Sequence, residues 1–174
     1  MTRVEFFDGQ TLRNFTNAEC EFQYRESVFK RHKEWMILLV EFEMVPASVA
    51  NLRRSADDII RVRNEKFPPA MRCAGSIFKN LHVANLPPGL AEQIPPAAIR
   101  EGKVASAFFL EQVGAKGMRR DGIQVANYHA NLIYNAGGGT AVDLRAVIQE
   151  LRERVRARFG IDLEEEVQYL GDWE

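Results

Sequence analysis

Hydrophobic and polar residues follow different patterns along the first part of the chain, and each pattern predicts an element. Residues 4–10 (Val-Glu-Phe-Phe-Asp-Gly-Gln) are typical of a short strand that enters a turn at Asp-Gly. Residues 35–44 begin as an apolar run and end in strict alternation, which predicts a strand buried on both faces at first and solvated on one face later. Residues 49–62 repeat apolar positions every three or four residues, which predicts an amphipathic helix that ends before Pro68 and Pro69.

The second part of the chain begins with a stretch that lacks periodicity. Residues 81–103 are rich in Pro, Ala and Gly and contain two Pro-Pro pairs, so we expect an irregular excursion over the surface. A connection of this length favours a functional loop or lid. Residues 105–113 then predict a short helix, and residues 123–125 and 130–134 predict two strands separated by a polar turn.

The clearest helix lies between Thr140 and Gly160, where apolar residues form one continuous stripe. Thr140 is a natural N-cap with Asp143 three positions later, and Gly160 is a natural C-cap. The glycines at 137–139 leave two interpretations open, because helix N-terminal amides can bind a phosphate but a glycine run is also a common flexible turn. Together the elements predict an α+β fold in which a small sheet is covered by the two long helices.

Composition narrows the classes of partner. The 174 residues carry a formal net charge of −1, which gives no electrostatic reason to expect nucleic acid or an anionic membrane as partner. No segment has the length of apolar sequence that a membrane span needs, so we expect a cytoplasmic protein. Cys20 and Cys73 are expected to be reduced thiols. The three histidines, His32, His82 and His129, do not fall at metal-ligand spacing, so no metal site is predicted.

Residues 74–80 (Ala-Gly-Ser-Ile-Phe-Lys-Asn) place a hydroxyl, an ammonium and a carboxamide close together, directly after a glycine. The glycine lets the backbone approach a ligand or make a turn that a larger residue would resist, and the Ser76 hydroxyl is then free to face a pocket. A serine nucleophile usually needs a Gly-x-Ser-x-Gly turn, but Ile77 and Phe78 follow here. Its other possible task is to donate a proton, although a Gly-Ser pair by itself is usually an ordinary turn.

Two further segments carry polar groups with a possible chemical role. Residues 24–27 (Tyr-Arg-Glu-Ser) contain Arg25, whose planar guanidinium suits a carboxylate or an enolate, although a surface arginine paired with an acid is the simpler interpretation. Residues 163–167 (Leu-Glu-Glu-Glu-Val) form an acidic run of the kind that is normally solvated. A lone histidine such as His129 is more often structural than catalytic.

Residues 24–27, 74–80 and 163–167, in this order along the chain, resemble three motifs of the UDP-N-acetylenolpyruvoylglucosamine reductases. These are the MurB-type flavoenzymes of peptidoglycan precursor synthesis. The resemblance extends from about Val4 to Gly171. It implies that Ser76 protonates the substrate carbon after hydride has arrived from the flavin. It also implies that Arg25 stabilises the enolate and that Glu166 acts as a neutral donor or proton relay.

The resemblance assigns further residues to the substrate and exposes two departures. Glu26 replaces the usual aspartate, and Leu81 replaces the proline that usually follows the Lys-Asn pair. Glu164 and Glu165 are expected to be solvent-exposed and without a role. The residues expected to contact the substrate are Tyr24, Lys79, Asn80, His129 and Asn131.

The family resemblance also implies the cofactors and the domain organisation. It implies FAD, with NADPH as hydride donor, in the reduction of UDP-N-acetylglucosamine enolpyruvate to UDP-N-acetylmuramate. The family's N-terminal flavin-binding region has no counterpart here, so we expect residues 1–70 to be the C-terminal end of an FAD-binding domain with a connecting helix. Residues 71–174 are expected to form the substrate-binding domain. We therefore expect the chain alone to bind flavin weakly or not at all, to show no turnover, and to be able to dimerise through an exposed strand edge.

Two alternatives remain open at this level. One is a non-catalytic module that binds a sugar nucleotide or a protein. The other is a different flavin oxidoreductase that shares the substrate-side fold but not the substrate.

Overall fold

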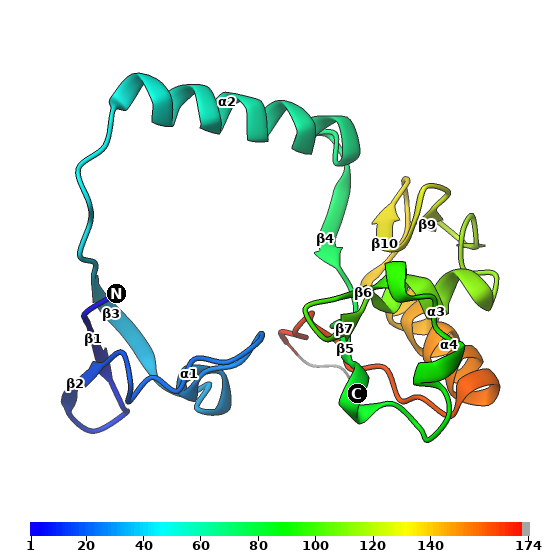
Figure 1. Ribbon diagram of the computed structural model, residues 1–174, viewed down its shortest axis with the longest axis horizontal. Coiled ribbons are helices and arrows are strands. Elements are labelled where there is room, and N and C mark those ends of the chain that lie inside the picture. The colour runs from blue at the N-terminus through cyan, green and yellow to red at the C-terminus, as the bar shows by residue number, and fades with distance from the viewer. Residues whose placement is uncertain (172–174) are drawn as a thin grey trace. The chain divides into compact units, whose positions relative to one another are not determined.

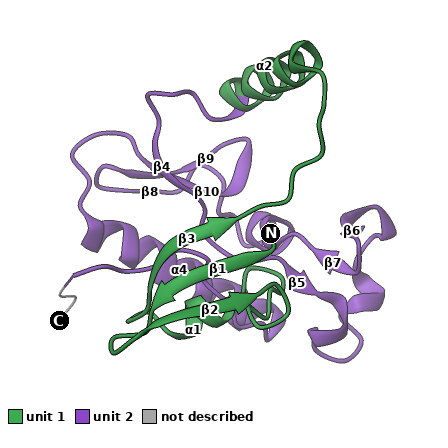
Figure 2. Ribbon diagram, turned by 90° about the vertical axis from the view of Figure 1, so that its left-hand side faces the viewer, with its two compact units in different colours: residues 1–65 green, residues 66–174 purple. Residues whose placement is uncertain are grey.

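The computed structural model describes residues 1–171 and has an α+β fold, as predicted (Figure 1). The chain forms two compact units, Met1–Glu65 and Lys66–Glu174 (Figure 2). In the sequence, the boundary between the units falls at residues 65–66, close to the domain boundary expected near residue 70. The assignment of the first unit to a flavin-binding domain stays a prediction.

The first unit contains a three-stranded antiparallel sheet. Its strands are β1 (Arg3–Phe7), β2 (Leu12–Thr16) and β3 (Met36–Glu41), in the order β2-β1-β3. The Asp8 carboxylate accepts a hydrogen bond from the Thr11 amide at 2.8 Å, which closes the turn between β1 and β2. The predicted N-terminal strand and its Asp-Gly turn are therefore confirmed.

An aromatic cluster forms the small core of the first unit. Phe6 of β1 is fully buried, and its ring centroid lies 4.7 Å from that of Phe15 and 5.2 Å from that of Phe29. Trp35 stacks on Phe6 at 4.7 Å. The short helix α1 (Val28–Arg31) carries Phe29 into this cluster. Because aromatic pairs stabilise beyond their buried area, they can hold a sheet with few other core residues.

The pattern was misleading about burial in β3 and in the long helix of this unit. Every residue of β3 is exposed, although its apolar run predicted burial on both faces. It pairs with β1 along one edge only, and no residue of 1–65 pairs with its other edge. The predicted helix is confirmed as α2 (Val49–Lys66), but none of its side chains is buried. The prediction that both long helices cover a sheet is therefore wrong for α2. An apolar pattern shows which face a segment tends to bury, and a partner must be present for burial to occur.

The second unit is built on a four-stranded antiparallel sheet. Its strands are β4 (Arg72–Ser76), β8 (Arg119–Arg120), β9 (Ile123–Ala126) and β10 (His129–Asn135), in the order β4-β10-β9-β8. A two-residue turn joins β9 to β10. The predicted pair of strands is confirmed, but His129 is the first residue of a strand and not part of the turn.

The helix α4 (Ala141–Phe159) has the predicted boundaries. Thr140 Oγ1 accepts from the Asp143 amide at 3.1 Å, and the Asp143 carboxylate accepts from the Thr140 amide at 2.8 Å. Gly160 ends the helix in the left-handed conformation, with φ +67°. One face of α4 is buried in the core, through Val147, Ile148, Leu151 and Val155.

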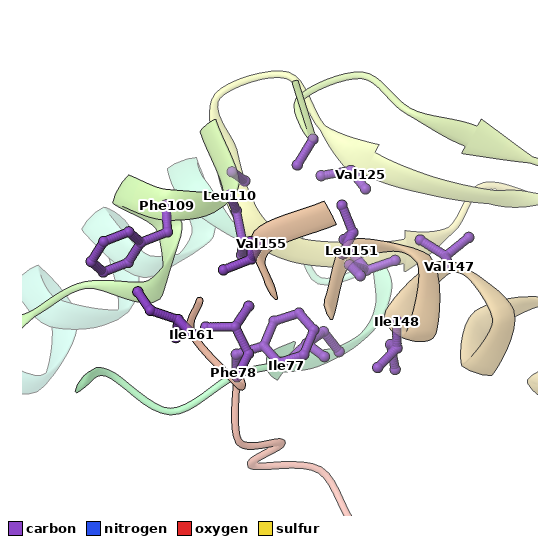
Figure 3. Packing of buried hydrophobic residues seen from close by; sticks show 14 of the residues in the cluster. Ile77, Phe78, Phe109, Leu110, Val125, Val147, Ile148, Leu151, Val155 and Ile161 are labelled. Atoms are coloured by element: carbon purple, nitrogen blue, oxygen red, sulfur yellow. The ribbon is translucent and has the colours of Figure 1, made fainter. Parts of the chain in front are cut away.

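The main hydrophobic core gathers side chains from elements far apart in the sequence (Figure 3). Ile77 and Phe78, which directly follow β4, lie among side chains of α4. The helix α3 (Ser106–Gln112), close to the predicted 105–113, adds Phe109 and Leu110. The core therefore anchors the residues that come immediately after Ser76.

Residues 81–103 run mostly along the surface, as predicted, but they contain short regular elements that the prediction did not include. They form a second small sheet of two-residue strands, β5 (Leu81–His82), β6 (Ile99–Arg100) and β7 (Lys103–Val104), in the order β5-β7-β6. Ile94 and Val104 are buried. Two-residue strands are too short to produce an alternating pattern, which explains why the sequence did not reveal them. Three 3₁₀ helices lie in the same segment, Val83–Asn85, Ala91–Gln93 and Pro96–Ala98.

The glycine run before α4 is a tightly bonded loop. The side-chain oxygen of Asn135 accepts from the amides of Gly137 at 2.9 Å and Gly139 at 3.2 Å. The Asp143 carboxylate occupies the N-terminus of α4 and bonds the Thr140 amide. A carboxylate at this position repels an anion, so the structure does not favour phosphate binding there.

Candidate functional site

Ser76 is the last residue of β4 and follows a β-bulge. The register runs from the pair Cys73 and Tyr134 to the pair Ser76 and Leu132, so β4 has one residue more than β10 in this interval. Gly75 has φ +84°, and a Cβ there would meet no atom within 4 Å. The glycine is therefore required by backbone conformation and not by space. Such a bulge bends a strand and redirects the next side chain, and Ser76 is exposed.

The chain after Ser76 pairs with the C-terminal segment. Phe78 and Glu165 form an isolated antiparallel bridge. The amide of Glu166 donates to the carbonyl of Ile77 at 2.7 Å. The antiparallel register therefore sets half-buried Glu166 opposite Ile77, next to Ser76. The structure therefore pairs the backbone of Glu166 with the residue that directly follows Ser76.

Lys79 and Asn80 continue the same segment. The amide of Lys79 donates to the carbonyl of Glu164 at 2.9 Å, and its ammonium pairs with the Glu164 carboxylate. The Lys79 side chain is 10% exposed and that of Glu164 is 70% exposed. Asn80 is exposed, and its side-chain oxygen accepts from the Ser106 amide at 3.4 Å. Glu164 is therefore solvent-exposed, as expected, and it also forms an ion pair with the buried Lys79.

Glu165 is also not the solvated residue that the acidic run suggested. Its side chain is 17% exposed and lies 3.1 Å from the Arg152 guanidinium of α4. The Tyr169 hydroxyl donates to the same carboxylate at 2.6 Å. Burial, and then this hydrogen bond, raise the pKa of Tyr169 to about 12. Glu165 therefore attaches the segment that carries Glu166 to α4.

Asn131 lies beneath this segment and is 3% exposed. Its side-chain oxygen accepts from the amides of Ile77 at 3.2 Å and Phe78 at 2.9 Å. Direct contact between Asn131 and a substrate stays a prediction, and this burial does not favour it.

His129 is half-buried at the start of β10. Its Nδ1 accepts from the Asn131 amide at 3.3 Å, which requires an unprotonated Nδ1. Burial lowers the pKa of His129, and the ammonium groups of Lys116 and Lys66 lower it further, while Glu111 has the opposite effect. The neutral imidazole is therefore the form that the fold favours.

Because the pKa of His129 is lowered in the folded chain, we expect the free energy of unfolding to decrease as the solution becomes more acidic. Below its ordinary pKa of about 6.5, His129 binds protons more readily in the unfolded chain than in the folded one, so the free energy of unfolding decreases as the pH drops. We expect His129→Asn to reduce this loss, because asparagine does not bind a proton in this pH range. Its amide oxygen can still accept from the Asn131 amide, so the local hydrogen bond is kept. Urea unfolding between about pH 8 and pH 5 measures the effect, with exposed His82→Asn as the control. Parallel curves for His129→Asn and the unsubstituted protein would contradict it.

Tyr24 and Arg25 belong to the first unit, whereas the other predicted site residues belong to the second. They are the central residues of a turn closed by hydrogen bonds between Gln23 and Glu26, at 3.0 and 3.2 Å. Arg25 has φ +58°, which is uncommon for a residue with a side chain. Its guanidinium carbon lies 5.6 Å from the centre of the Tyr24 ring, and its carbonyl accepts from Lys30 Nζ at 2.8 Å. The turn thus presents an exposed guanidinium from a fixed backbone.

Metal sites, disulfides, membrane-spanning helices and cavities are the other features of the described residues that could bear on function. Residues 1–171 contain no group of three or more His, Cys, Asp or Glu that could hold a metal ion. Both cysteines are free thiols. Across the same residues, no helix has the length and apolar character that crossing a membrane requires. A cavity of about 360 Å³ lies between Arg72–Ala74 of β4 and the start of α4, but Ser76 does not line it.

Comparison with known proteins decides which family has this arrangement. Residues 67–170 match the model of the UDP-N-acetylenolpyruvoylglucosamine reductase C-terminal domain. The chain belongs to the UDP-N-acetylenolpyruvoylglucosamine reductase family. It is 62% identical over 168 residues to the reductase of Solibacter usitatus, covering 97% of this chain and 54% of that protein. It is 35% identical over 170 residues to the reductase of Moorella thermoacetica, covering 97% of this chain and 49% of that protein.

A solved structure of the reductase family supports the fold. The crystal structure of UDP-N-acetylenolpyruvylglucosamine reductase (MurB) from Thermus caldophilus matches with a TM-score of 0.66 at 22% identity. The match covers 97% of this chain and 52% of that one. The chain therefore spans about half the length of the curated relatives that it matches.

Proposed function

We propose that the chain forms the substrate side of a reductase that converts UDP-N-acetylglucosamine enolpyruvate to UDP-N-acetylmuramate with FAD and NADPH. This reaction would serve peptidoglycan precursor synthesis in the cytoplasm. The observation that carries the proposal is the pairing of the Ser76 strand end with the Glu166 segment in a member of this family. Within the proposal, residues 1–70 belong to the flavin-binding domain and residues 71–174 form the substrate-binding domain.

Two helix N-termini among the described residues are not open to a diphosphate group. The N-terminus of α4 is occupied by its own capping carboxylate, Asp143, and α1 has only four residues. Helix N-terminal amides open to an anion are the usual means of holding such a group. Within the proposal, these two N-termini therefore do not hold the flavin diphosphate.

The proposed chemistry of this chain is charge stabilisation followed by proton delivery. Reduction of an enol ether conjugated to a carboxylate places negative charge on the carbon beside the carboxylate. Arg25 would stabilise that charge through a two-donor contact with the carboxylate or enolate. Ser76 would donate a proton to the carbon, and half-buried Glu166, on the segment that pairs with Ile77, would act as the neutral donor or relay. Tyr24, Lys79, Asn80 and His129 would contact the substrate.

A chimera tests the function directly. The chain replaces the region that it matches in the Solibacter usitatus reductase, to which it is 62% identical. We expect NADPH oxidation that depends on UDP-N-acetylglucosamine enolpyruvate. A folded chimera that binds FAD but does not oxidise NADPH with this substrate would contradict the proposal and would favour another flavin oxidoreductase.

The chain alone tests the division of labour. We expect FAD titration, followed by flavin absorbance and fluorescence, to show weak binding or none, while the enolpyruvate substrate raises the melting temperature. Tight stoichiometric FAD binding would contradict the expectation of an incomplete cofactor site. A substrate that stabilises this chain while the chimera remains inactive would favour a non-catalytic sugar-nucleotide module.

We also propose self-association through β3. Leu38 and Leu39 are 52% and 43% exposed, and both faces of the strand are apolar. An exposed apolar edge strand is a template for pairing with another chain. We expect Leu39→Lys to shift the chain toward monomer in a concentration series by light scattering, whereas Val142→Lys on α4 has no effect. A chain that is monomeric before substitution would contradict this proposal.

A further inference from the structure

A buried pair of polar side chains lies beneath the segment that follows Ser76. Ser106 is fully buried at the start of α3, and Asn131 is 3% exposed on β10. Side chains of these types are seldom buried unless their hydrogen bonds are satisfied. Among the described residues, no buried side-chain nitrogen or oxygen lacks a partner. The pair therefore has a definite bonding role inside the core.

Both ends of the Asn131 carboxamide bond the peptide at Ile77 and Phe78. The side-chain oxygen accepts from the amides of both residues, at 3.2 and 2.9 Å. The side-chain nitrogen donates to the carbonyl of Phe78 at 2.8 Å and to the hydroxyl of Ser106 at 2.8 Å. The Ser106 hydroxyl donates to the same Phe78 carbonyl at 3.3 Å. The carboxamide thus bonds backbone amides and a backbone carbonyl, as a neighbouring strand would. The Ser106 hydroxyl accepts the second hydrogen bond of the carboxamide nitrogen.

A local irregularity in β10 makes this possible. His129 of β10 pairs with Ala126 of β9, and the next pair is Ile133 with Val125. Residues 130–132 of β10 therefore have no partner on β9, because Val125 and Ala126 are consecutive. Asn131 lies in this interruption. An interrupted ladder redirects side chains that regular pairing would fix, and Asn131 bonds the continuation of β4 instead.

The peptide held by this pair connects the two residues proposed to move protons. Ile77 directly follows Ser76, and the carbonyl of Ile77 accepts from the Glu166 amide at 2.7 Å. A shift of this peptide would therefore displace Ser76 and Glu166 together. Small displacements of groups that react with a substrate can cost large factors in rate.

We propose that Ser106 and Asn131 are positioning residues that hold the Ser76 and Glu166 segments in register. Neither contacts the substrate in this proposal, which distinguishes it from the substrate contact that the family resemblance implied for Asn131. The catalytic consequence rests on the function proposed above, whereas the hold on the peptide does not.

Amide hydrogen exchange on the 174-residue chain tests the hold without any catalytic assay. We expect Asn131→Ala to speed exchange at Phe78 by about tenfold more than at Leu151 of α4, because local opening adds to global opening. The effect at Ile77 should be smaller, because its amide also donates to the Asn131 backbone carbonyl at 3.2 Å. Val155→Ala, which removes buried volume from α4, is the control for a purely global loss of stability. A uniform increase for Asn131→Ala, like that expected for Val155→Ala, would overturn the proposal.

Ser106→Ala keeps the proposal testable where Asn131→Ala does not fold. It removes one partner of the Asn131 nitrogen and leaves the Phe78 carbonyl bonded to it at 2.8 Å. We expect faster exchange at Phe78, by less than Asn131→Ala produces. Protection equal to that of the unsubstituted chain would overturn the assignment of Ser106.

The catalytic consequence is measured in the chimera. We expect Asn131→Ala to lower kcat by about tenfold or more, with KM changed by less than about threefold, because binding contacts remain while alignment is lost. A rise in KM with kcat unchanged would overturn the positioning role and favour direct substrate contact. An inactive chimera before substitution would count against the proposed function, whereas the exchange experiment would still decide the hold on the peptide.

Discussion

Ser76→Ala is expected to lower turnover in the chimera by about 10²–10⁴-fold while substrate affinity changes little. The alanine keeps the bulge at Gly75 and removes only the hydroxyl that would deliver the proton. Because Ser76 is exposed at the end of β4, its loss leaves no cavity in the core. The effect should therefore appear in the chemical step and not in folding.

Three measurements separate an effect of Ser76→Ala on the chemical step from an effect on substrate binding or on folding. Substrate-dependent NADPH oxidation gives kcat and KM, a substrate-induced shift in melting temperature reports binding, and urea unfolding confirms that the fold is retained. Ser55→Ala, on exposed α2, is the matched control and should have the activity of the unsubstituted chimera. Activity of Ser76→Ala within about threefold of that control would exclude Ser76 as the proton donor.

Gly122→Ala is expected to destabilise the chain by about 3 kcal/mol, the upper part of the range for overpacking. A Cβ at Gly122 would lie 2.1 Å from the carbonyl oxygen of Gly137 and 2.1 Å from the amide nitrogen of Gly139. Both are backbone atoms in the loop that the Asn135 side chain fixes. They cannot rotate away as a flexible side chain could, so the loop before α4 would have to shift.

Urea unfolding measures this loss, and Gly102→Ala separates steric clash from backbone strain. Gly102 has φ +70°, but a Cβ there would meet nothing within 4 Å. We expect Gly102→Ala to cost only about 1 kcal/mol, from its left-handed conformation. Equal losses for the two variants would show that the close approach at Gly122 is not the cause.

Local signals in the sequence were sufficient where an element depends on its own residues. The N-cap at Thr140, the C-cap at Gly160 and the apolar stripe between them fixed α4 before any contact was known. Gly75 before Ser76 was expected to serve backbone freedom, and its φ of +84° confirms this. The motif order along the chain was also sufficient to indicate the family, which the comparisons then established.

The roles of Asn131 and Glu165 could not be obtained in this way. Each depends on residues far away in the sequence, Phe78 for Asn131 and Arg152 for Glu165. An acidic run or a carboxamide has the same local pattern whether it is solvated or buried. Only the folded chain determines whether a partner is present to satisfy it.

What the sequence by itself determined is therefore the set of local elements, the α+β class and the family motifs, because capping, periodicity and turn chemistry act within a few residues. The tertiary structure decided that β3 and α2 are exposed, that residues 81–103 contribute to a small sheet, and that Ser106 bonds Asn131. It also decided that the Glu166 segment pairs with the residues directly after Ser76. Burial and hydrogen bonding between distant segments depend on which surfaces meet, and a periodic pattern does not specify its partner.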